Sequence, residues 1–152
     1  MRFARLAFIV GFIAAAAICA AAQEGHPLTG TWYGDFGLSS SQRNDLTVVL
    51  KWDGKEVSGM VNPGPNVVQI KTGRMDVQLG KPAQRGENGR GGIPATPSTF
   101  LVHFEVDAKN KAGGIDHFVF DGHLENPVAG NRSMVGTWTC GNTKGDFRLR
   151  RL

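Results

Sequence analysis

The strongest constraint on the fold of this chain is the alternation of apolar and polar residues with a period of two, which recurs after residue 28. The clearest stretch is 99–107 (TFLVHFEVD), where Phe100, Val102, Phe104 and Val106 all fall on one face of an extended strand. No segment after residue 22 repeats with the period of about 3.6 that an amphipathic helix requires. The sequence therefore predicts an all-β fold.

Gly, Asn, Asp and Pro interrupt the alternation at short intervals, as turns between strands do. Asp53-Gly54 is a tight turn of the kind that needs positive φ. Because closure covers an apolar face and removes exposed edges, the antiparallel meander is expected to form a barrel or barrel-like sandwich of about eight strands. The expected strands are 29–36, 46–52, 55–61, 67–71, 99–107, 115–124, 133–139 and 146–151, with a further short one at 75–79.

The first 22 residues have the three parts of a secretory signal peptide. A basic start (1–5) precedes an apolar run (6–19), and three alanines end at the expected cleavage point after Ala22. The apolar run is too short to span a bilayer comfortably, and cleavage would leave no stable membrane anchor. We therefore expect a secreted or periplasmic protein with one domain, residues 23–152.

The net charge limits the kinds of partner to be expected, and the cysteine content limits the disulfides. The chain has 17 Lys and Arg and 13 Asp and Glu, and loss of Arg2 and Arg5 with the signal leaves 15 against 13, a net charge of +2. Such a weak charge on an exported chain argues against nucleic acid as a partner. Cys140 is the only cysteine after the signal, so no internal disulfide is expected and the thiol should be buried.

Residues 80–98 (GKPAQRGENGRGGIPATPS) break the regular pattern with five glycines, three prolines and three basic residues. This composition excludes an interior strand. A loop of this length is either a functional element or a mobile insertion, and the sequence leaves both alternatives open.

The stretch 28–33 (LTGTWY), followed by a meander of strands, resembles the opening of the calycin barrels, the group of lipocalins and avidin-like proteins. The whole pattern is also similar to that of small exported bacterial β-domains. The calycin resemblance implies that Trp32 packs across one end of the barrel. It also implies that an arginine near the chain end, Arg148 or Arg150, stacks on this ring and helps to close the barrel. Gly34 stands where avidin-like proteins have an asparagine that contacts biotin, so biotin is not the expected ligand.

Aromatic side chains can fill a barrel or line a cavity for a ligand, and an eight-stranded barrel is wide enough for either. Trp52 lies at a strand end beside the Asp53-Gly54 turn. We expect Trp52 and Tyr33 to lie at the rim of the barrel and to contact a ligand, at the end opposite Trp32.

Histidines and carboxylates share the polar face of two successive strands. His103 and Glu105 lie opposite the phenylalanines of 99–107, and a hairpin would place His117 across from Glu105. Two imidazoles and a carboxylate at such distances are a candidate site for Zn²⁺ or a similar ion. The alternative is an ordinary solvated outer face.

No G-x-S-x-G elbow, phosphate-binding loop or dinucleotide fingerprint is present, so no catalytic residue and no cofactor is expected. The function that the sequence favours is non-catalytic binding of a small apolar or amphipathic molecule in the barrel mouth. One alternative is a structural or protein-interaction module that uses the exposed faces and the 80–98 loop. Another is a small metal-dependent enzyme.

Overall fold

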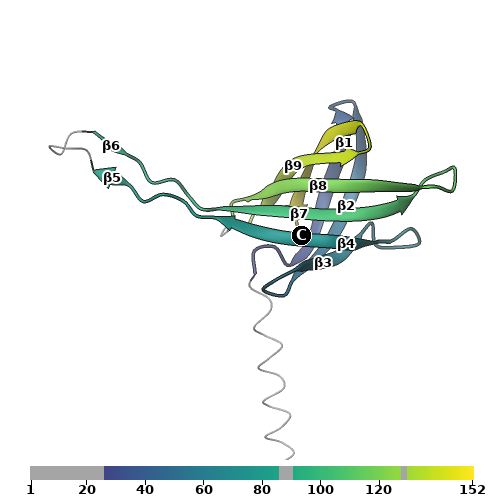
Figure 1. The fold of residues 1–152 in the computed structure, drawn as a ribbon, viewed down its shortest axis with the longest axis horizontal. Coiled ribbons are helices and arrows are strands. Elements are labelled where there is room, and N and C mark those ends of the chain that lie inside the picture. The colour runs from purple at the N-terminus through teal and green to yellow at the C-terminus, as the bar shows by residue number, and fades with distance from the viewer. Residues whose placement is uncertain (1–25, 86–90, 128–129) are drawn as a thin grey trace, which may run out of the picture.

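The computed structural model describes residues 26–85, 91–127 and 130–152; the predicted signal peptide lies outside them. In this part of the chain there is no helix, and hence none that could cross a membrane. Eight antiparallel strands form a closed barrel in the order β1-β10-β9-β8-β7-β4-β3-β2 (Figure 1), which confirms the expected all-β class. The barrel strands are β1 (Gly30–Ser39), β2 (Gln42–Trp52), β3 (Val57–Val61), β4 (Val68–Gln78), β7 (Thr99–Lys109), β8 (Ile115–Glu125), β9 (Ser133–Cys140) and β10 (Thr143–Arg151).

The alternation in the sequence becomes the division between the inside and the outside of the barrel. On β7, Val102, Phe104 and Val106 are at most 3% exposed, whereas the intervening Leu101 is 41% exposed. Successive side chains of a strand point to opposite faces, so one face of each strand supplies the core. Burial of these apolar side chains is the main stabilising contribution to the fold.

Aromatic rings fill the middle of the barrel and continue toward one end. Phe104 and Phe120 are stacked with ring centroids 4.7 Å apart, and Phe147 meets Phe120 edge to face at 5.6 Å. Farther along, Phe36 and Trp138 lie 5.4 Å apart, and the Trp138 indole N–H donates to the Gly37 carbonyl at 3.3 Å. The interior is thus occupied by the protein's own side chains.

Two glycines, Gly122 on β8 and Gly145 on β10, make room for these rings. A Cβ on Gly122 would lie 2.7 Å from Cζ of Phe147, and one on Gly145 would lie 2.6 Å from Nε1 of Trp138. Both distances are well below van der Waals contact. The absence of side chains at these two positions is therefore part of the packing.

Leu28 and Trp32 seal one end of the barrel, which we call the closed end. Both are 0% exposed, and the Trp32 indole N–H donates to the Leu28 carbonyl at 2.8 Å. Residues 26–29, the 53–56 turn and the last residues of β10 all belong to this end, since Gly30 lies opposite Leu50 and Trp32 lies opposite Arg151. Leu28, which precedes the first strand, thus helps Trp32 to close this end of the barrel.

The expectation that Arg148 or Arg150 covers Trp32 is wrong. Both arginines are exposed, and they lie opposite Asp35 and Tyr33 on the outer face of the barrel. They alternate with the buried Phe147 and Leu149, so their side chains point away from the interior.

The two strands expected at 67–71 and 75–79 are one continuous strand, β4. Its pairing with β7 shifts in register between Ile70 and Thr72, as at a β-bulge. A bulge changes the alternation of side chains at this point, which explains why the sequence pattern divided the strand there.

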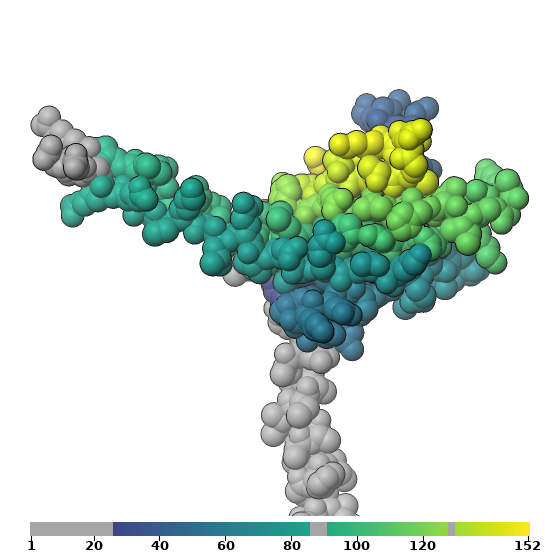
Figure 2. Space-filling model, viewed as in Figure 1, coloured from purple at the N-terminus to yellow at the C-terminus, as the bar shows by residue number. Residues whose placement is uncertain are grey.

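The described residues of the 80–98 segment contribute no strand to the barrel. They carry a separate pair of short strands, β5 (Gln84–Arg85) and β6 (Gly92–Ile93), on an arm that projects from the barrel (Figure 2). At the base of the arm, the Lys81 N–H donates to the Thr96 hydroxyl at 2.8 Å. Leu79, at the start of the arm, is 79% exposed.

Replacing Leu28 tests the seal of the closed end. Leu28→Ala removes a fully buried side chain and should lower the free energy of unfolding by about 3 kcal/mol. Leu38→Ala removes the same atoms from a side chain that is 52% exposed and should change it by about 0.5 kcal/mol or less. Urea denaturation of the two variants measures the difference, and equal effects would contradict the placement of Leu28.

Candidate functional site

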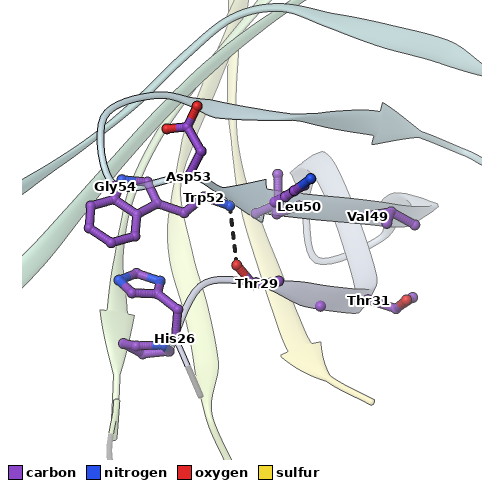
Figure 3. Close-up of a pocket in the computed structure, with 11 residues that line it drawn as sticks. His26, Thr29, Thr31, Val49, Leu50, Trp52, Asp53 and Gly54 are labelled. Carbon is purple, nitrogen blue, oxygen red and sulfur yellow. Dashed lines mark hydrogen bonds between the residues drawn. The ribbon is translucent and has the colours of Figure 1, made fainter. Parts of the chain in front are cut away.

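A half-open hollow of about 700 Å³ lies at the closed end, on the outside of the barrel wall (Figure 3). Thr31 of β1 and Val49 and Lys51 of β2 form its floor, because they alternate with residues that point into the core. The segment before β1 and the turn after β2 form its sides. The hollow therefore lies at the edge of the closed end, where its lining includes both outward-facing residues and the core residue Leu50.

Trp52 and His26 form one side of the hollow with their rings stacked. Their centroids are 4.0 Å apart and their planes differ by 26°. The Trp52 backbone N–H donates to the Thr29 hydroxyl at 3.1 Å and so ties the segment before β1 to the end of β2. Within that segment, the Leu28 N–H donates to Nδ1 of His26 at 3.2 Å. The seal made by Leu28 thus also positions His26 against Trp52.

The turn beside Trp52 is fixed by Asp53. Its Oδ1 accepts hydrogen bonds from the Lys55 and Glu56 N–H groups at 2.9 and 2.8 Å. These backbone donors hold the pKa of the Asp53 carboxyl below its ordinary value. Gly54 has φ of 101°, which confirms the predicted positive φ, although the turn closes over four residues, with the Asp53 N–H donating to the Glu56 carbonyl.

Two arginines bring positive charge to the closed end. The Arg151 backbone N–H donates to the Arg132 carbonyl at 3.1 Å, so the two residues are adjacent although they are far apart in sequence. The Arg151 guanidinium packs over Gly30, where a Cβ would lie 2.8 Å from its Nε. Partial burial lowers the pKa of His26 below its ordinary value, and the positive charges of Arg132 and then Arg151 lower it further.

The described residues of this end leave two buried hydrogen-bond donors without acceptors. Trp52 Nε1 and Arg132 Nε are buried, and within the described residues neither has a hydrogen-bond partner. A buried donor left without an acceptor costs about 1–3 kcal/mol. The described residues also provide no carboxylate in an ion pair with Arg132 or Arg151.

Tyr33 and Trp52 do not share a barrel mouth opposite Trp32, and that expectation is wrong. Trp52 ends β2 at the same end as Trp32, because β1 and β2 are antiparallel. Tyr33 is 48% exposed on the outer wall, opposite Arg150, and does not line the hollow. Of the two predicted ligand contacts, only Trp52 lies at the hollow.

The predicted metal ligands do come together, in a different register from the one expected. Glu105 lies opposite Val119, and His117 lies opposite Asp107. His103 Nε2 is 3.0 Å from Oε1 of Glu105, and His117 Nε2 is 3.5 Å from its Oε2.

The other ring nitrogen of each histidine also faces a carboxylate, at 2.7 Å for His103 and Asp121 and at 2.6 Å for His117 and Asp107. The result is a ladder of alternating rings and carboxylates across β7 and β8 on the outer face. Among the described residues, no group of three or more His, Cys, Asp or Glu is arranged to hold a metal ion. The ladder links neighbouring strands as cross-strand pairs do.

Cys140 is half-buried at the end of β9. Burial, with a smaller contribution from Asp116, raises the pKa of its thiol. A raised pKa leaves little thiolate at neutral pH, and the thiolate is the form that acts as a nucleophile. Packing therefore accounts for Cys140 better than catalysis does.

Three residues at the closed end were not predicted: His26, which lines the hollow, and Arg132 and Arg151, which lie beside His26 but not in the lining. The alternation contains a signal for Arg151, which has the same parity as the buried Phe147 and Leu149. No comparable signal exists for His26 and Arg132, because they lie outside the strands. Their positions are set by the connections before β1 and between β8 and β9, which the alternation does not describe.

No family model matches the chain, and neither a curated protein nor a solved structure matches it. The geometry of the barrel and the hollow is therefore the basis for any assignment of function.

The pKa of His26 gives a test of the site in the absence of a ligand. Because burial and two nearby cations disfavour the imidazolium, its NMR titration should have a midpoint below 6.5. The unfolded chain then takes up a proton first, so His26 should reduce stability as the pH falls below 6.5. His26→Gln should remove this part of the pH dependence, whereas a midpoint at or above 6.5 would contradict the described contacts.

Proposed function

We propose that this protein is an exported, non-catalytic binding protein for a small apolar or amphipathic molecule. The observation that carries the proposal is the hollow beside Trp52, combined with an interior that the protein fills with its own rings. We infer that the ligand site lies at the closed end beside Trp52, and not in the barrel mouth.

The walls of the hollow suit a flat molecule. Trp52 offers a large ring whose conformation is restricted by His26 stacked against it, so little flexibility would be lost on binding. Val49 and Pro27 add apolar surface, and the hydroxyl of Thr31 adds a polar contact. Mostly apolar walls with a few polar groups are typical of small-molecule sites.

We also propose that the chain is a relative of the calycin barrels. The support is the closed antiparallel barrel of eight strands, together with Gly30 and Trp32 on the first strand at its closed end. Fold likeness by itself does not assign a ligand.

Removal of the Trp52 ring tests the proposed site. Phenylnaphthylamine, a neutral aromatic dye that fluoresces on leaving water, should bind the full-length mature chain. Trp52→Ala should weaken this binding about tenfold or more, because the stacking surface is lost. Tyr33→Ala removes an exposed ring outside the hollow and should leave the affinity unchanged.

A second variant keeps this test decisive if Trp52→Ala unfolds the protein. Thr31→Trp places a bulky ring on the floor of the hollow without touching the core, and it should block the dye. Near-ultraviolet circular dichroism confirms that each variant is folded. Equal binding by the wild type and by both folded variants would refute the hollow as the site.

The projecting arm favours a second candidate function, that of a protein-interaction module. Its described part carries Lys81 and Arg85 and no acidic residue, and Ile93 is 63% exposed. Replacing residues 81–97 by a short turn tests this candidate. If the arm mediates association, sedimentation should show a complex of the full chain that the shortened chain does not form. A monomer in both cases, with dye binding intact, would leave the hollow as the functional site.

A further inference from the structure

The chemistry of the closed end identifies the kind of ligand that the hollow would accept, an inference that rests on the proposed function. His26 lines the hollow, and Arg132 and Arg151 lie beside His26 without lining the hollow themselves, so three basic side chains come together at this end. Within the described part of the chain, neither guanidinium is in an ion pair with a carboxylate. On the outer wall, by contrast, Arg43 is paired with both Asp35 and Asp146.

Among the described residues that line the hollow, the only acidic one is Asp53. Its carboxylate accepts two backbone N–H groups within its own turn. It is therefore already engaged, and it forms no ion pair with the described arginines.

A lack of hydrogen-bond acceptors accompanies the excess of positive charge. The two buried side-chain donors without a partner in the described residues, Trp52 Nε1 and Arg132 Nε, both belong to residues of this end. Buried donors are normally satisfied, and an exception calls for an explanation such as a missing ligand. The acceptors and counter-charges that the described residues do not provide here would both be supplied by one kind of partner, an anion.

We propose that the ligand of the hollow carries an anionic group, a carboxylate, sulfonate or phosphate, which Arg132 and Arg151 bind while its flat or apolar part lies against Trp52. A guanidinium can donate two parallel hydrogen bonds to such a group, and charge-assisted bonds of this kind are stronger than neutral ones. Partial burial of both arginines reduces screening by solvent.

Two dyes that share the same ring system separate the anionic group from the rest of the ligand. Anilinonaphthalene sulfonate is phenylnaphthylamine with an added sulfonate. The mature wild-type chain should bind the sulfonate about tenfold more tightly than the neutral dye, because of the charge-assisted hydrogen bonds. Arg132→Gln should abolish this preference, so that the ratio of the two dissociation constants, measured in the same variant, falls to about one.

Arg150→Gln is the matched control. It removes the same charge from a neighbouring position, but its side chain is exposed on the outer face opposite Tyr33. The variant should keep the preference for the sulfonate. Loss of the preference in both variants would show that net charge, and not a site, attracts the dye.

A measurement on the wild-type protein removes the dependence on correctly folded variants. A bound anion offsets the two arginines, so the NMR titration midpoint of His26 should rise when the sulfonate is added and remain unchanged with the neutral dye. If both dyes bind with equal affinity and the midpoint does not move, the anion site is refuted while the proposed function stands. If neither dye binds, the proposed function fails as well.

Discussion

The hydrogen bond from the Trp32 indole to the Leu28 carbonyl, inside the closed end, is the interaction on which the rest of the structure depends. It fixes the segment before β1 across the end of the barrel, with Leu28 fully buried. The same segment then places His26 against Trp52, and Thr29 against the backbone of Trp52. One seal therefore both completes the core and forms the wall of the hollow.

Filling the interior moves the candidate site to the surface. Phe104 and Phe120 stack in the middle of the barrel, and Gly122 and Gly145 leave the space that neighbouring rings occupy. Side chains that pack in contact stabilise the core, and they leave little empty volume inside the barrel for a ligand. The hollow lies instead beside Trp52, a ring at the end of a strand, and Arg132 and Arg151 come close to it from other parts of the chain.

The alternation of residues predicted the fold well, because inside and outside are decided locally along each strand. It failed where pairing between strands decides the outcome. The register that sets His117 opposite Asp107 depends on the conformation of the hairpin loop, in which the Asn110 side chain accepts two backbone N–H groups. The hollow was not predictable for a related reason. The hollow depends on contacts between the residues before β1 and the end of β2. The alternation along one strand carries no information about contacts of this kind.

Exchange of the Trp32 indole proton with solvent tests the central claim most directly. If the closed end is sealed, this proton should exchange only when the whole domain unfolds, because it is hydrogen-bonded and buried. The Trp52 indole proton, which has no partner within the described residues, should exchange faster in the same NMR spectrum. A Trp32 proton that exchanges as fast as that of Trp52 would show that the end is open, and would contradict the account.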